Sequence, residues 1–152
     1  MKKIIFTLAC LIFISCASTK LPPAPASKTM MKQANQIVIV TDDKPKDSYK
    51  RFAQYLSSNG YSFKSTNKTL LTLQTENKMS QKKRGFSIYY RVNAAVIDST
   101  IKLNGIVAYP MGNEDEAENA GGENSEPRVA WEHIVNLAKN YPQSTQIFYK
   151  RN

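Results

Sequence analysis

The sequence predicts an α+β fold, in which a curved antiparallel sheet of about four to six strands carries two helices on one face. Several segments have apolar residues at every second position, which is typical of half-buried strands. Two other segments have apolar residues at helical spacing. Because antiparallel hairpins leave one face of a sheet apolar, the two helices are expected to cover that face.

The first half of the predicted domain begins with a strand and a helix. Residues 37–40, IVIV, form a continuous apolar run that ends at the turn-forming residues 41–43. Four apolar side chains then share one helical face: Tyr49, Phe52, Ala53 and Leu56. They predict a helix that ends at residues 59–60, which are Asn and Gly. Two short strands are expected next, around residues 61–63 and 71–73.

The second half contains the clearest hairpin of the chain. Residues 86–96 and 101–109 alternate between apolar and polar side chains, and residues 98–99 join them as a turn. Residues 131–141 place their apolar side chains on one helical face, so a second helix is expected there. A short strand at 145–150 would complete the domain.

The first fifteen residues have the pattern of an export signal. Lys2 and Lys3 precede the apolar run 4–14, and small residues follow it. As a helix, this run would rise only about 16 Å, well short of the roughly 30 Å hydrocarbon layer of a bilayer. We therefore expect residues 1–15 to be a signal peptide that takes no part in the fold.

The end of this segment resembles the lipobox of bacterial lipoproteins, in the residues Phe13, Ile14, Ser15 and Cys16. Phe13 departs from that pattern, which usually has Leu or another aliphatic residue there. The resemblance implies transfer of a diacylglyceryl group to the Cys16 thiol, cleavage before Cys16 and acylation of the new amino terminus. Because Ala17 follows, the sorting rule of the family implies the outer membrane, and we favour its periplasmic face. The alternative is an ordinary signal peptide with an incidental cysteine.

Residues 16–36 are predicted to be a lipidated, Pro-rich tether, and residues 37–152 a single domain. The tether has few large apolar groups, and its prolines keep it extended. Within the domain, residues 111–127 contain no aromatic side chain and almost no apolar one. We expect this segment to be an exposed, mobile, acidic loop.

Charge is distributed unevenly along the chain. It has 21 Lys and Arg residues against 12 Asp and Glu residues, and removal of Lys2 and Lys3 leaves 19 basic residues. Six of the acids lie in the acidic loop: Glu114, Asp115, Glu116, Glu118, Glu123 and Glu126. The rest of the domain is therefore strongly cationic. Export excludes nucleic acid as its partner, whereas anionic lipid or lipopolysaccharide would attract such a surface.

The basic run Lys82, Lys83 and Arg84 is the best candidate for such an anionic contact, because three adjacent charges on an exposed loop act together. The alternative is a solvated loop without a partner. Likewise, scattered lysines that merely solvate the surface would explain the overall charge.

No residue pattern indicates an enzyme, a metal site or a cofactor. His133 is the only histidine, and a histidine without cysteine partners makes no zinc site. If Cys16 is modified, the mature chain keeps no free thiol, because Cys10 lies in the signal peptide. Asp42, Asp43 and Asp47 lack the glycine and terminal glutamate of a calcium loop. The phosphate-loop, nucleophile-elbow and zinc-protease motifs are also missing.

The order of elements is similar to the helix-grip or TATA-binding-protein-like group of folds, which recurs in small envelope lipoproteins. One of these belongs to the outer-membrane protein assembly machine. We therefore expect a non-enzymatic, membrane-anchored lipoprotein that acts as an interaction module in envelope assembly or maintenance, with an envelope protein as a candidate partner. The alternative is a carrier or sensor that binds a small molecule or lipid between helices and sheet. Seven aromatic residues could line such a pocket: Tyr61, Phe63, Phe86, Tyr89, Tyr90, Tyr109 and Trp131.

Overall fold

The computed structural model describes residues 21, 24–83 and 86–152, and for residues 81–83 and 86 the backbone alone. The helices are α1 (Pro45–Ser58) and α2 (Glu126–Lys139). The strands are β1 (Ala24–Ser27), β2 (Gln36–Val40), β3 (Phe63–Asn67), β4 (Thr72–Thr75), β5 (Lys78–Lys83), β6 (Phe86–Ile97), β7 (Thr100–Ala108), β8 (Glu114–Glu116) and β9 (Gln146–Arg151). The α+β class is as predicted.

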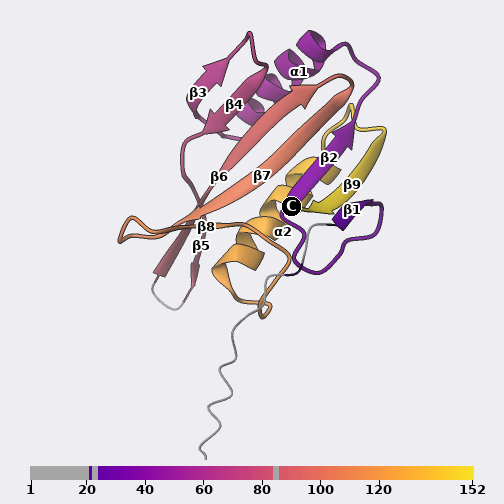
Figure 1. Ribbon diagram of the computed structural model, residues 1–152. Coiled ribbons are helices and arrows are strands. Elements are labelled where there is room, and N and C mark those ends of the chain that lie inside the picture. Colours follow the sequence, from indigo (N-terminus) through magenta and orange to yellow (C-terminus); the bar gives the residue numbers. More distant parts are fainter. Residues whose placement is uncertain (1–20, 22–23, 84–85) are drawn as a thin grey trace, which may run out of the picture.

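The strands form one antiparallel sheet in the order β1-β9-β2-β7-β6-β4-β3, with β5 paired to β6 and β8 paired to β7 (Figure 1). Its nine strands exceed the four to six that were predicted. The additional strands β1, β5 and β8 lie in segments rich in proline, lysine or acid, and each pairs with a single neighbour. Such short polar edge strands carry no apolar alternation, so periodicity does not reveal them.

Both helices lie behind the sheet in Figure 1, so the viewer faces its uncovered side. Burial follows the same division, because buried and half-buried residues alternate along the whole of β7. The buried side packs on α1 and α2, and its largest fully buried side chains include Trp131, Phe52, Ile37 and Leu103. The core between helices and sheet is thus filled by side chains from every layer.

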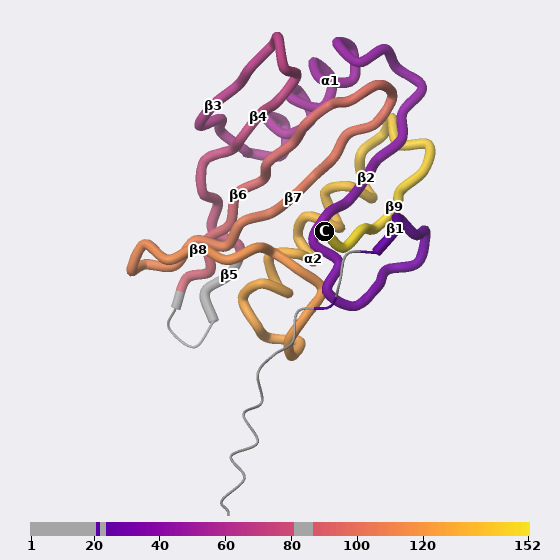
Figure 2. Tube along the Cα trace, viewed as in Figure 1, coloured from indigo at the N-terminus to yellow at the C-terminus, as the bar shows by residue number. Residues whose placement is uncertain are grey.

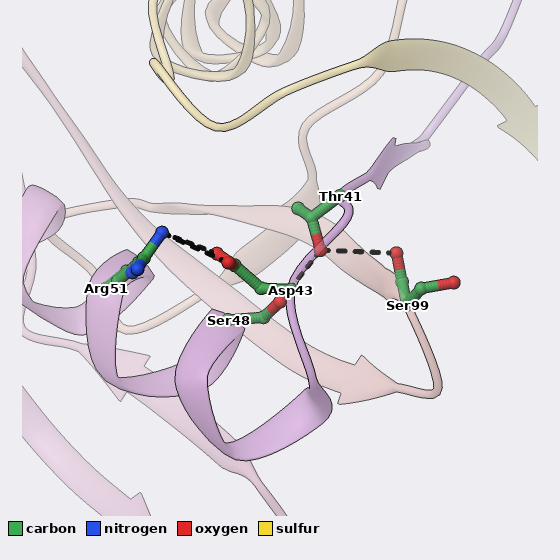
Figure 3. Close-up of polar contacts among 5 residues, drawn as sticks. All are labelled: Thr41, Asp43, Ser48, Arg51 and Ser99. Carbon is green, nitrogen blue, oxygen red and sulfur yellow. Dashed lines mark hydrogen bonds and ion pairs between the residues drawn. The ribbon is translucent and has the colours of Figure 1, made fainter.

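The start of α1 is attached to the turn between β6 and β7 (Figure 3). The Thr41 and Ser48 hydroxyl oxygens lie 2.7 Å apart, and the Thr41 backbone N–H donates to the carbonyl of Ser99 at 2.9 Å. Arg51 donates to the Asp43 carboxylate at 3.0 Å. The acids considered for a calcium loop therefore flank the start of a helix, where carboxylates are favourable.

The domain was predicted to begin at residue 37, after a tether of residues 16–36. In the structure, regular structure already begins at β1. Strand β1 (Ala24–Ser27) pairs with β9, and residues 33–35 are buried. The Gln33 N–H donates to the carbonyl of Asn119 at 2.8 Å, and the Asn119 N–H donates to the carbonyl of Ala34 at 2.8 Å. Backbone pairing orders this segment although it contributes few apolar side chains.

The acidic loop is also more structured than expected. Residues Glu114–Glu116 form β8, and Ala117 is fully buried against the sheet. Its N–H donates to the carbonyl of Gly105 at 2.9 Å.

Neither helix in the described part of the chain is long and apolar enough to cross a bilayer.

Candidate functional site

The uncovered face of the sheet carries a row of carboxamide side chains. Cross-strand register places Gln74 of β4, Asn93 of β6, Asn104 of β7 and Gln36 of β2 side by side, and Lys150 of β9 continues the row. In Figure 2, these strands run next to one another across the front of the molecule. All five residues are half-buried, so each presents part of its side chain to solvent.

Hydrogen bonds between neighbouring strands hold the carboxamides in place. Gln74 Nε2 donates to Asn93 Oδ1 at 2.9 Å, and Gln36 Nε2 donates to Asn104 Oδ1 at 3.1 Å. Asn104 Nδ2 donates to the carbonyl of Asn35 at 3.0 Å. Within the described part of the chain, this leaves the Asn93 amide group as a donor and the Gln74 and Gln36 oxygens as acceptors without partners.

A shallow hollow of about 380 Å³ lies over this row. Its lining consists of the four carboxamides, the hydroxyls of Ser65 and Thr72, the small residue Ala95, Lys102, and the edges of Leu73 and Ala94. The hollow contains no aromatic ring and no carboxylate. It is therefore a polar depression with one cationic group. Cross-strand hydrogen bonds hold its carboxamide groups in place before any partner binds.

Three lysines lie on or beside the uncovered face: Lys102 on β7, Lys150 on β9 and Lys28 after β1. Lys102 forms no ion pair with any described residue. Lys102 pairs across strands with Val38, which pairs in turn with Phe148. The ammonium group of Lys28 lies 5.9 Å from the centre of the Phe148 ring. Together with Lys150, these lysines make this side of the face cationic.

The end of the uncovered face beyond Asn104 carries acids, because β8 pairs with residues 106–108 of β7 there. Arg91 of β6 makes two hydrogen bonds to Glu114, at 2.5 and 2.6 Å. This hydrogen-bonded pair lowers the pKa of Glu114 and raises that of Arg91. Asn35 donates to Glu116 at 2.8 Å. Two acids of the predicted acidic loop, Glu114 and Glu116, thus attach β8 to the sheet.

A second, smaller cavity of about 300 Å³ lies where the C-terminal ends of both helices meet β5. Tyr61 and Tyr90 line it, and their hydroxyl oxygens lie 2.7 Å apart. His133 stacks on Tyr90 with ring centres 5.4 Å apart, and Lys78 lies 4.0 Å above the centre of the Tyr61 ring. Burial raises the pKa of both tyrosines and lowers that of His133.

The internal contacts of this second cavity are structural. Lys78 Nζ donates to the carbonyl of Asn59, which follows the last turn of α1, at 2.5 Å. A cation at that end of a helix is favourable because the terminal carbonyls carry partial negative charge. His133 and Lys78 each occupy an aromatic face, so neither tyrosine offers a fully free ring for stacking.

The structure describes some of the site residues predicted from the sequence and leaves others outside its described range. Cys16 and Arg84 lie outside the described residues, as do the side chains of Lys82 and Lys83. The backbone of those two lysines belongs to β5, which pairs with β6, so they lie in a strand and not in the expected loop. Of the seven aromatics, Tyr61 and Tyr90 line the smaller cavity, whereas Trp131 is fully buried in the core.

The carboxamide row is the feature that sequence reasoning missed. Its four members occupy the polar positions of strands with alternating burial. Such positions usually indicate only solvent exposure. A usable signal existed, because neutral amides take these positions on four different strands, but only the register shows that they align.

No protein-family model matches the chain, and no curated protein matches it by sequence. Among solved structures, it is similar to a TBP-like protein from Parabacteroides distasonis ATCC 8503, with 13% sequence identity and a TM-score of 0.39. The superposition covers 76% of this chain and 99% of that one. A similarity of this extent says nothing about function.

Proposed function

We propose that this chain is a non-enzymatic binding module of the bacterial cell envelope, attached to the outer membrane through lipidated Cys16. Its uncovered sheet face is the binding surface. Lipidation of Cys16 would hold the domain at a bilayer, and the helices would keep the sheet rigid from behind. The module would then present its hollow and its lysines to an envelope component.

One observation carries this proposal: both helices cover the same side of the sheet, and the other side is uncovered, with a polar hollow over its carboxamide row. Carboxamides at the centre of this face are preorganised by cross-strand hydrogen bonds, so little side-chain freedom is lost when a partner binds. Because side chains fill the core between helices and sheet, an interaction surface is favoured and a ligand chamber at that place is not.

The second candidate function is the binding of a small molecule in the cavity beside Tyr61 and Tyr90. Its volume of about 300 Å³ lies at the lower end of the range for ligand sites. Asn59, Asn136 and Asn140 would supply polar contacts there. The covered aromatic faces and the capping role of Lys78 favour the uncovered sheet face instead.

Photo-crosslinking in intact cells tests the proposal. A photoreactive amino acid is placed at Val38 or Ala95 on the uncovered face, and at Lys50 on α1 as the matched control. Both open-face positions should give a discrete crosslinked product that the control position does not give. Crosslinks from Lys50 alone, or none from the uncovered face, would contradict the proposal.

A further inference from the structure

The chemistry of the hollow on the uncovered face narrows the class of partner, and this inference rests on the proposed function. Anchors of protein interfaces are large aromatic or apolar side chains in desolvated pockets. The hollow has none, because small, hydroxyl and carboxamide residues line it together with Lys102. It is therefore poorly suited to a protein side chain and better suited to a hydroxyl-rich ligand.

The hydrogen-bonding groups that remain available alternate between donor and acceptor. The Asn93 amide donates, the oxygen of the neighbouring Gln74 accepts, and the oxygen of Gln36, beyond Asn104, also accepts. A sugar hydroxyl both donates and accepts, so hydroxyls spaced along a short oligosaccharide can satisfy these groups, which span three strand spacings or roughly 14 Å. Ser65 and Thr72 add two more groups of the same kind at the rim.

Charge complementarity adds a second requirement. Lys102 lies in the hollow without a carboxylate partner in the described part of the chain, and Lys150 ends the carboxamide row. Two strand spacings and two residues separate the lysines, which places their Cα atoms roughly 12 Å apart. A ligand that pairs with each lysine through a separate group therefore carries at least two negative charges along its length.

We infer that the uncovered face binds an acidic oligosaccharide, with sugar hydroxyls on the carboxamides of Gln74, Asn93 and Gln36 and carboxylates on Lys102 and Lys150. The shallow, open shape of the hollow suits a chain that lies across the strands. Glu114 and Glu116 lie beyond Asn104 along β7, so they would disfavour extension of an anionic ligand past that end of the row.

Calorimetric titration of the purified full chain in detergent tests this inference with three probes. Oligogalacturonate supplies one carboxylate per sugar ring, dextran supplies hydroxyls without charge, and polyglutamate supplies charge without hydroxyls. Oligogalacturonate should bind most tightly, and added salt should weaken its binding because the lysines are only half-buried. Equal affinity for polyglutamate, or no binding of oligogalacturonate, would overturn the inference.

Matched variants identify the face. Lys102→Gln should weaken oligogalacturonate binding about tenfold, and Asn93→Ala about fivefold. Lys50→Gln and Gln54→Ala, on the exposed side of α1, should leave it unchanged. Thermal unfolding followed by circular dichroism verifies that each variant is folded. Unchanged binding in both open-face variants would place the ligand elsewhere.

The two proposals can fail separately. If the full chain does not bind oligogalacturonate but photo-crosslinks still form from Val38 and Ala95, the saccharide inference is wrong and the proposed function stands. If neither binding nor open-face crosslinks are found, both are wrong.

Discussion

At the scale of single residues, the buried hydroxyl pair Tyr61 and Tyr90 has a consequence for stability at alkaline pH. Their side chains are 7% and 2% exposed. Burial raises the pKa of each, and for Tyr61 the hydrogen bond to Tyr90 raises it further. Each tyrosine therefore keeps its proton in the folded chain at a pH where the unfolded chain has lost it.

The free energy of unfolding should thus be level with respect to these groups below pH of about 10 and should fall as the pH rises above that value. Urea unfolding at a series of alkaline pH values measures this. Tyr61→Phe should lower stability by about 1–3 kcal/mol at neutral pH, because the Tyr90 hydroxyl loses its partner. It should also make the alkaline decline shallower. A steeper decline in the variant would show that Tyr61 does not titrate as described.

Single residues also mark the limit of sequence reasoning. The sequence excluded His133 as a zinc ligand, and the structure finds it half-buried on α2. Nothing in the sequence indicated that its ring stacks on Tyr90, because that contact joins α2 to β6 across many residues. The carboxamide row was hidden for the same reason.

At the scale of elements, the packing of α2 on the sheet depends on Gly105 in β7. A Cβ atom there would overlap Cδ1 of Ile134 and would lie 2.8 Å from the Cβ of Ala117. Gly105→Ala must therefore push α2 or the segment after β8 away from the sheet. We expect a loss of about 2–3 kcal/mol in the free energy of unfolding, measured by urea denaturation. Gly122→Ala is the matched control, since no atom lies near its added Cβ. Equal effects of the two substitutions would refute close packing at Gly105.

Strand β8 depends on the ion pair between Arg91 and Glu114. Arg91→Met removes both hydrogen bonds that hold Glu114 to β6. We expect faster amide hydrogen exchange in β8 and at Ala117, with little change in global stability, because ion pairs near the surface contribute modestly. Arg128→Met is the control, since it removes the exposed pair of Arg128 with Glu132 on α2. If β8 exchanges at the same rate in both variants, backbone pairing alone holds the strand.

Elements with strong apolar periodicity were predictable from sequence. The hairpin of β6 and β7 and both helices lie where the pattern placed them. Strands β1, β5 and β8 were not predictable, because their stability comes from pairing with an existing edge and not from an apolar face of their own. The paired edges also explain why the folded part begins within the expected tether.

At the scale of the whole molecule, the proposed role depends on attachment to a membrane. Cys16→Ala should release the chain into the soluble periplasmic fraction, because acyl chains would no longer hold it at the bilayer. Cys10→Ala should leave it in the membrane fraction. Fractionation with immunoblotting measures both, and mass spectrometry of the amino-terminal peptide identifies the modification. Membrane retention of the Cys16 variant would mean that another feature attaches the chain.

The most direct test of the uncovered face as the binding surface is the thiol accessibility of single-cysteine variants. Thr72→Cys places a thiol at the hollow, and Gln54→Cys places one on the exposed side of α1. Maleimide labelling is compared between native envelope membranes and the purified full chain. Binding at the uncovered face predicts slower labelling of the Thr72 variant in membranes and unchanged labelling of the Gln54 variant. Equal labelling of the Thr72 variant in both preparations would contradict it.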